Sequence, residues 1–345
     1  YGKKVIILLD EYDTPMQEAY IDGYWDELVA FTRSLFNSTF KTNPWLERGI
    51  MTGITRVSKE SIFLDINNLK VVTTTSDEYA TSFGFTEEEV REMLTYYGQH
   101  YEFNHTIDEL IDIMKPYYDN YCFALKAYGK TTMYNSNMVL SFLFKYIDEG
   151  CELPLQMLDE NIRVDYNKLR MLIRKDKEFA HDASIIQTLV SKGYVTGELK
   201  EGFPAEDIAN NDNFLSLLYY FGMVTIGGFY RGKPKFVIPN EVVREQVYTY
   251  LLDNYHDNHL YTDKDKLSLL EENMAYDGEF KPFFQFIADS IYTFASQRDR
   301  QKGESFVHGY TLALTSLCCY YRPISELDNQ NGYADVFLRP RCEIF

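Results

Sequence analysis

Residues 4–10, "KVIILLD", constrain the fold of this chain more than any other stretch of its sequence. An unbroken apolar run of this length is typical of a strand that is covered on both faces in a parallel sheet. The run leads directly into the carboxylates Asp10, Glu11 and Asp13, and Pro15 follows. We therefore expect a buried strand whose carboxyl end carries a cluster of negative charge.

The next hundred residues continue the α/β pattern. Helical periodicity covers 26–40, a second buried strand is expected within 47–57, and a third within 67–85. Residues 86–98 form a predicted helix in which Thr86 and Glu89 have the spacing of a capping box. Strands that alternate with helices predict an α/β fold with a mostly parallel sheet.

The remainder of the chain is richer in helical patterns. Helices are expected within 96–205, including 106–121, 136–150 and a basic stretch at 165–179. Residues 213–252 show a helix, a hairpin and another helix, the order of a winged-helix element, and two helical segments follow within 262–302. A helix at 303–321 then precedes two short strands, 322–329 and 332–340, joined by a turn predicted at Asn331-Gly332.

Charge and composition exclude some classes of protein. The formal net charge is −18, which argues against a surface that binds nucleic acid over its whole extent. No apolar run is long enough to span a bilayer, so no membrane partner is expected. The five cysteines lack metal-ligand spacing, and adjacent Cys318 and Cys319 are predicted to be core residues. This pattern favours a reducing, cytoplasmic location.

The acidic cluster after the first strand has a chemical interpretation. In open α/β sheets, ligands bind at the carboxyl ends of the strands. There Asp10 could hold Mg²⁺ through water, and Glu11 could orient or deprotonate the water that attacks a γ-phosphate. Asp13 could assist or supply a negative charge at the N-terminus of the next helix. The alternative is an ordinary acidic turn that ends at Pro15.

Thr52 and Arg56 follow the second predicted strand. A polar residue at this position can sense the γ-phosphate of a nucleotide, and a nearby cation can stabilise its charge. The alternative is that both are ordinary surface residues at a strand end.

Four motifs occur in an order that resembles a known family: "LLDEYDTP", "MTGITRVSKESIF", "YATSFGFTEEEV" and "YDNYCF". Over residues 4–338 the chain resembles bacterial AAA-ATPase-like proteins that carry a C-terminal PD-(D/E)xK nuclease domain. The resemblance implies a P-loop ATPase core at 1–95, a helical lid at 96–205, a winged-helix element at 206–256 and a partial restriction-endonuclease-like α/β domain at 257–345. It also implies that ATP and Mg²⁺ are cofactors and that Asp10 and Glu11 are the Walker-B pair.

The sequence departs from the family at the phosphate-binding loop, which in the family precedes the Walker-B strand. "GGFYRGKP" at 227–234 fits G-x-x-x-x-G-K, but Pro234 replaces the Mg²⁺-binding Ser or Thr, and the stretch lies in a predicted hairpin. We interpret it as a hairpin turn, since no helix N-terminus follows to bind phosphate.

The resemblance also identifies candidate metal ligands near the C-terminus. Nucleases of this type hold Mg²⁺ with carboxylates and position the nucleophile with a Lys. By resemblance, Asp335 begins one strand of the site, Glu326 lies in the preceding strand, and Glu304 begins the helix before them. No Glu-x-Lys follows Asp335 in this chain, and Glu304 is alternatively a helix N-terminal acid that the dipole favours. His308 lies one turn beyond Glu304, and we interpret it as a packing residue.

The combined prediction is an AAA-type ATPase coupled to a metal-dependent DNA nuclease, here as an incomplete chain that hydrolyses ATP negligibly. DNA, a protein partner and a second copy of the chain remain open as partners. The alternative is a non-enzymatic, degenerate ATPase that regulates by binding DNA or protein. A plain nucleotide kinase fits poorly, because no acceptor-binding signature follows the second strand.

Overall fold

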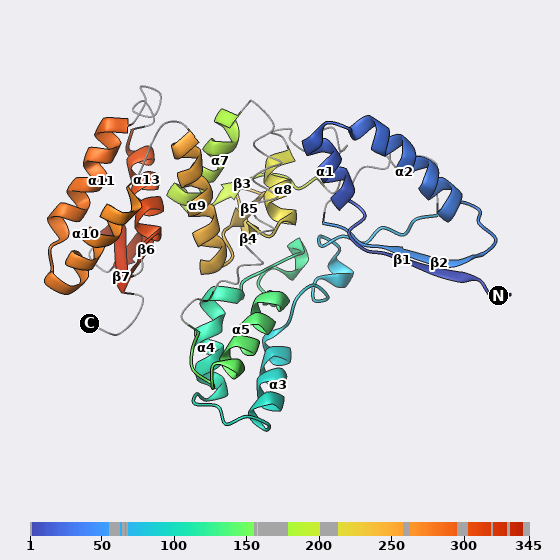
Figure 1. Cartoon of the computed structure of the whole chain (residues 1–345), viewed down its shortest axis with the longest axis horizontal. Coiled ribbons are helices and arrows are strands. Elements are labelled where there is room, and N and C mark those ends of the chain that lie inside the picture. The colour runs from blue at the N-terminus through green and yellow to red at the C-terminus, as the bar shows by residue number, and fades with distance from the viewer. Residues whose placement is uncertain are drawn as a thin grey trace. The chain divides into compact units, whose positions relative to one another are not determined.

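The computed structural model describes residues 2–54, 63, 66, 68–154, 157, 179–200, 213–257, 263–294, 303–318, 320–329 and 332–340. The chain divides into two compact units (Figure 1). The first unit comprises 1–179 and 196–240, and the second comprises 180–195 and 241–345. The fold is mixed α/β, mostly helical with small sheets.

The first unit begins with a parallel pair of strands. Its elements are β1 (Val5–Leu9), α1 (Thr14–Asp22), α2 (Trp25–Phe40) and β2 (Leu46–Met51). The two helices form the crossover that parallel strands require (Figure 1). The predicted parallel pairing of the first two strands and the helix at 26–40 are therefore confirmed.

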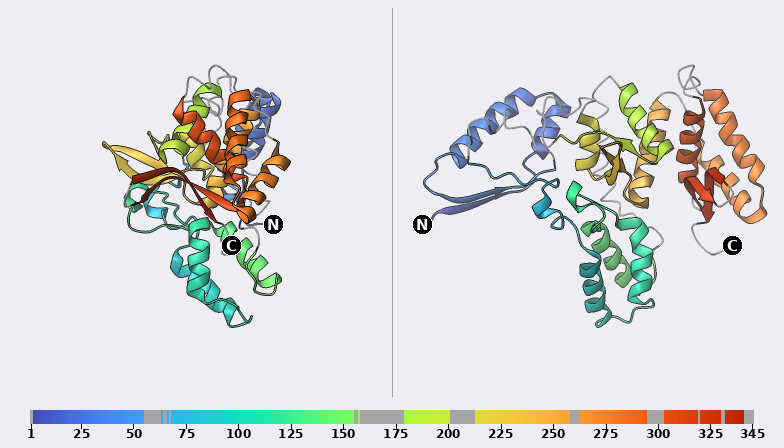
Figure 2. Two further views of the ribbon diagram at one scale, coloured as in Figure 1. Left: turned by 90° about the vertical axis from the view of Figure 1, so that its left-hand side faces the viewer. Right: turned by 180° about the vertical axis from the view of Figure 1, so that it is seen from behind.

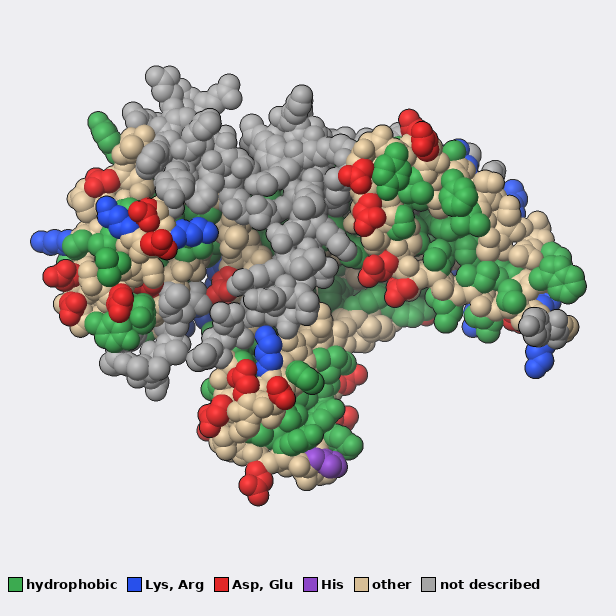
Figure 3. Space-filling view, viewed as in Figure 1, with side chains coloured by type: hydrophobic (Ala, Val, Ile, Leu, Met, Phe, Trp, Pro, Cys, Tyr) green, Lys and Arg blue, Asp and Glu red, His purple; other side chains and the backbone are tan. Residues whose placement is uncertain are grey.

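Two predictions of burial are wrong for the described residues: the first strand is not covered on both faces, and the second is not buried, since residues 47–50 of β2 are exposed. Ile6 is 62% exposed and Leu8 is 74% exposed. Phe40 of α2 packs against Gly49 of β2, whereas Ile6 and Leu8 of β1 stay open to solvent. Apolar side chains accordingly gather at the surface over this part of the chain (Figure 3).

The third strand predicted within 67–85 is also absent from its described residues, 68–85. Thr73 and Ser76 instead close a local turn: the Thr73 amide donates to Ser76 Oγ at 3.1 Å, and the Ser76 amide donates to the Thr73 carbonyl at 2.9 Å. Such local bonds compete with a strand ladder. The 3₁₀ helix η1 (Asp77–Tyr79) follows, and only Phe85 makes a strand-like bridge, to Tyr134.

Three helices of the first unit follow the predicted positions: α3 (Glu87–Gly98), α4 (Ile107–Tyr118) and α5 (Ser136–Asp148). The Thr86–Glu89 capping box is confirmed, and Thr106 with Glu109 forms a second one. The predicted basic helix at 165–179 lies outside the described residues, apart from Phe179.

The first unit ends with the predicted helix and hairpin: α8 (Phe214–Tyr220), β4 (Thr225–Tyr230) and β5 (Lys233–Val237). The hairpin belongs to a three-stranded sheet of order β3-β5-β4, in which β3 is Val195–Thr196. The "GGFYRGKP" stretch therefore forms two antiparallel strands and their turn, which confirms its interpretation as a hairpin.

The second unit packs helices against an antiparallel hairpin. Its elements are α7 (Phe179–Lys192), α9 (Glu241–Asp257), α10 (Lys264–Asp277), α11 (Phe280–Phe294), α13 (Glu304–Ser316), β6 (Tyr321–Asn329) and β7 (Gly332–Pro340). Phe283, Phe306 and Tyr310 are fully buried in its core. The predicted turn is one residue too late, because Gly332 already pairs with Asn329.

The β1–β2 pair is parallel, whereas the described β4–β5 and β6–β7 pairs are antiparallel. The sheet that contains β1 has only two described strands, so the mostly parallel sheet predicted for the chain is not found in the described residues. Within the same residues, no helix is both long enough and apolar enough to cross a membrane. Cys318 is buried, as predicted, and Cys122 and Cys151 are buried free thiols.

Candidate functional site

The carboxyl ends of β1 and β2 lie side by side, because the two strands are parallel. Asp10 follows the last residue of β1, and Thr52 follows the last residue of β2. The Thr52 hydroxyl donates a hydrogen bond to Oδ1 of Asp10, and the Thr52 amide donates to the carbonyl of Leu9 at 2.9 Å. Two residues that are 42 positions apart in sequence, and that were each predicted to face a nucleotide, are thus in direct contact.

Glu11 has an unusual backbone conformation. Its φ is +49°, in the left-handed region that costs a non-glycine residue about 1–2 kcal/mol. The Glu11 amide donates to Asp10 Oδ1 at 3.0 Å, and Thr14 Oγ1 donates to Glu11 Oε2 at 3.3 Å. These bonds orient both carboxylates at the strand end, where both side chains are exposed.

Asp13 has a different environment from its two acidic neighbours, since it is only 1% exposed. Its Oδ1 accepts from the Ile54 amide at 3.2 Å, and its Oδ2 accepts from Gln17 Nε2 at 3.0 Å. Asp13 therefore joins the start of α1 to the segment after β2. Sequence reasoning assigned it a helper role and missed this structural one, because the partner amide is 41 residues away.

Residues 1–63 match the family model of a predicted AAA-ATPase.

The match contains Asp10, Glu11, Thr52 and Arg56, and we call residues 1–63 the AAA-ATPase-like segment. The resemblance expected over 4–338 is therefore supported over this segment only, and the comparisons give no support for a nuclease domain. No curated protein and no solved structure matched the chain.

The donor atoms at the carboxyl ends of β1 and β2 suit Mg²⁺. This ion prefers oxygen ligands and usually keeps several waters while bound by one or two carboxylates and by phosphate. Asp10, Glu11 and Thr52 provide such oxygens at one exposed edge. In the parts of the chain that are described, no group of three or more acidic, His or Cys residues could hold a metal ion. Arg56 lies outside the described residues.

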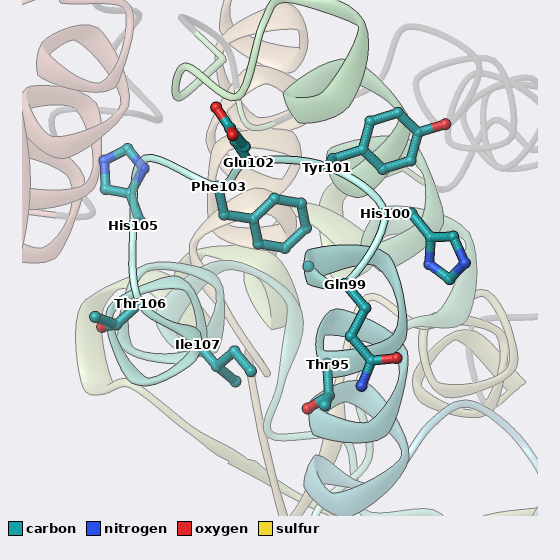
Figure 4. Close-up of a pocket in the computed structure, with 10 residues that line it drawn as sticks. Thr95, Gln99, His100, Tyr101, Glu102, Phe103, His105, Thr106 and Ile107 are labelled. Carbon is teal, nitrogen blue, oxygen red and sulfur yellow. The ribbon is translucent and has the colours of Figure 1, made fainter.

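Two hollows in the described surface lie away from this edge. The first, of about 660 Å³, is formed by the end of α3 and the connection to α4 (Figure 4). Phe103 points into it, whereas the rings of Tyr101 and His100 lie at its border (Figure 4). The second, of about 350 Å³, is lined by Tyr20 and residues 23–27. Asp10, Glu11 and Thr52 line neither hollow.

The candidate nuclease residues lie in the second unit. Glu304 is the first residue of α13 and Asp335 lies in β7, and both side chains are exposed. Glu326 lies in β6, and its side chain is outside the described part of the structure. His308 donates through Nε2 to the carbonyl oxygen of Asp335 at 2.7 Å, a contact that joins α13 to β7. This contact is in keeping with the packing role predicted for His308.

Proposed function

We propose that the AAA-ATPase-like segment binds Mg²⁺-ATP at the carboxyl ends of β1 and β2. The observation that carries the proposal is the hydrogen bond between Thr52 and Asp10, which joins the ends of two parallel strands. Its support from the comparisons is the family match over residues 1–63.

Each residue has a separate role in the proposal. Asp10 holds the Mg²⁺ through water, and the bound ion offsets the charge of the phosphates. Glu11 orients the attacking water and accepts its proton as the bond between the β–γ bridging oxygen and the γ-phosphorus breaks. Thr52 and Arg56 contact the γ-phosphate. The left-handed backbone of Glu11 supports this assignment, since strain of this kind is concentrated at functional sites.

The test is equilibrium binding of a fluorescent ATP analogue to the full chain, with Mg²⁺ and with EDTA. Asp10→Asn is expected to weaken Mg²⁺-dependent binding by about tenfold, which corresponds to about 1.4 kcal/mol. Thr52→Val keeps the shape and removes the hydroxyl, and we expect a smaller loss in the same direction. Glu11→Gln should bind as tightly as the natural chain, because Glu11 acts on water.

The matched control is Asp22→Asn, which removes an exposed carboxylate at the other end of α1. Equal affinity of Asp10→Asn and Asp22→Asn would contradict the proposal, and so would binding that is independent of Mg²⁺. Because this chain is expected to hydrolyse ATP negligibly, the test measures binding and not turnover. The nuclease hypothesis is not carried further, because neither the comparisons nor the placement of Glu304 and Asp335 favours it.

A further inference from the structure

Two stretches of this strongly acidic chain contain no Asp or Glu: residues 120–147 and residues 213–240. The chain as a whole has 52 acidic residues against 34 Lys and Arg, so the local charge in these stretches has the opposite sign to that of the protein. The basic residues in them include Lys130, Arg231, Lys233 and Lys235.

The two stretches pack against each other within the first unit. Thr225 at the start of β4 donates through Oγ1 to the carbonyl of Cys122 at 3.0 Å and accepts from the Cys122 amide at 2.7 Å. Further along β4, the Tyr128 ring lies so close to Gly228 that a Cβ there would be 2.9 Å from the Tyr128 hydroxyl oxygen. The loop that contains Tyr128 and Lys130 therefore lies beside the hairpin.

One face of the β4–β5 hairpin carries the charge. Ile226 and Phe236 pair across the strands, and both are buried. Tyr230 pairs with Lys233, and Lys235, two residues further along β5, lies on the same face as Lys233, opposite to that of Phe236. The hairpin projects from the helices beside it (Figure 2, left). We define the hairpin patch as two exposed tyrosines and four cations: Tyr128, Lys130, Tyr230, Arg231, Lys233 and Lys235.

The turn of the hairpin contains an Arg where other residues fit better. Arg231 has φ +50° and Gly232 has φ +81°, the left-handed values of a two-residue turn that favours Asn-Gly. The guanidinium of Arg231 lies over the Tyr230 ring, 5.3 Å from its centroid. An Arg that is strained in this way, at the exposed end of a hairpin, points to a role outside the fold itself.

Acidic residues lie at two borders of the hairpin patch. Asp77 of η1 is ion-paired with Lys126 at 2.5 Å, and Glu78 lies next to Asp77. On the other edge, the Gly197 amide donates to the Pro234 carbonyl, which brings the neighbouring Glu198 towards β5.

We propose that the hairpin patch binds single-stranded nucleic acid. Its four cations can neutralise phosphates of a nucleic-acid backbone. Tyr128 is 48% exposed and Tyr230 is 44% exposed, so their rings provide faces on which unpaired bases stack. An acidic protein would satisfy the cations but has no comparable use for two exposed aromatic faces. The patch lies on β4, β5 and the loop at 125–131, so this inference does not depend on the proposed ATP site.

The experiment is fluorescence anisotropy of labelled 20-nucleotide oligo(dT) and oligo(U), and of a duplex, with the full chain and without nucleotide. At about 50 mM salt we expect single strands to bind with a Kd on the order of 10 µM, and the logarithm of affinity to fall with salt at a slope of about −3 for four phosphate contacts. Equal binding of DNA and RNA is expected, because the proposed contacts are to phosphates and bases and not to the 2′-hydroxyl.

Three variants report on the separate parts of the hairpin patch. Lys233→Gln with Lys235→Gln should weaken single-strand binding by about tenfold and reduce the salt slope. Tyr230→Leu should weaken single-strand binding by at least about fivefold, the loss of one stacked base. Arg231→Asn should weaken binding while the thermal midpoint stays the same or rises, since Asn accepts the left-handed turn.

The control is Lys264→Gln with Lys281→Gln, which removes the same charge from exposed positions of α10 and α11. Equal losses in the control and hairpin double variants would overturn the proposal. An absence of binding by the folded chain would also overturn it, as would a preference for the duplex that Tyr230→Leu leaves unchanged. A third contrary result is that poly-glutamate displaces labelled oligo(dT) as well as unlabelled oligo(dT) does. The last result would assign the patch to an acidic protein.

Discussion

Gly53 illustrates how closely the two strand ends approach at the residue scale. A Cβ on Gly53 would lie 2.4 Å from Asp13 Oδ1 and 2.8 Å from Cε1 of Tyr12. Asp13 Oδ1 cannot move freely, because Asp13 is buried and accepts two hydrogen bonds. Glycine is required here by space and not by backbone conformation.

Gly53→Ala is therefore expected to destabilise the first unit by about 1–3 kcal/mol, the usual cost of overpacking. Urea unfolding followed by circular dichroism measures this difference. Gly98→Ala is the matched control, since its new Cβ would meet the Phe103 ring at an ordinary 3.5 Å. We expect Gly98→Ala to be neutral or stabilising, and equal effects of the two substitutions would show that the contact with Asp13 is unimportant.

At the scale of elements, α3 and α4 show which interactions the sequence specifies locally. Both helices begin with a Thr-x-x-Glu capping box. Side chains then join the two helices, since Lys115 Nζ lies 2.8 Å from Glu87 Oε2 and Arg91 Nη1 lies 2.6 Å from Asp108 Oδ1. The hydrogen bond from Lys115, with a further one from Arg91, lowers the pKa of Glu87.

A lowered pKa makes the contribution of Glu87 to stability depend on pH. The contribution is complete above the ordinary pKa of 4.5 and is lost as the pH falls through the lowered value, because the folded state must then take up a proton on a paired carboxylate. Glu87→Gln should lower the free energy of unfolding by about 0.5–1 kcal/mol at pH 7, a size typical of partly exposed ion pairs. Denaturant unfolding at pH 7 and at pH 3 measures the change.

Glu88→Gln, in the same helical turn, is the control for a general loss of charge from the α3 N-terminus. A destabilisation by Glu87→Gln that is as large at pH 3 as at pH 7 would mean that packing, and not the ion pairs, is responsible.

At the scale of the whole molecule, two compact units share one chain. In the second unit, Glu241 begins α9 and is 8% exposed. It is paired with Arg244 at 2.5 Å and with Arg322 of β6 at 3.0 Å. A buried ion pair of this kind joins elements that are far apart in the sequence of the second unit.

Removing the carboxylate leaves the half-buried Arg244 and Arg322 without their anionic partner, which costs about 2 kcal/mol, as for a lost hydrogen bond to a charged group. We expect Glu241→Gln to lower the unfolding temperature of the second unit, and scanning calorimetry of the full chain measures it. Gly53→Ala should shift a different transition, that of the first unit. Glu272→Gln, an exposed acid on α10, is the control. If Glu241→Gln and Gly53→Ala move the same single transition, the units do not unfold separately.

The sequence by itself determined most of the local structure. The apolar run before Asp10 became a strand, the Thr86 capping box began a helix, and the Arg231-Gly232 stretch formed a hairpin turn. Such signals act between residues that are close along the chain, so they can be read without knowledge of the fold. The helix α1 was missed, although Pro15 in its first turn marks a helix start.

Only the tertiary structure decided which of these elements are covered and which side chains meet. Leu8 belongs to an apolar run but is exposed, because burial depends on what packs against a strand and not on its own composition. Asp10 and Asp13 are the same residue type only three positions apart. Asp10 nevertheless accepts a hydrogen bond from Thr52 at the surface, whereas Asp13 is buried next to Gly53. The partners of both aspartates, Thr52 and Ile54, lie more than forty positions further along the chain, so only the fold brings them together.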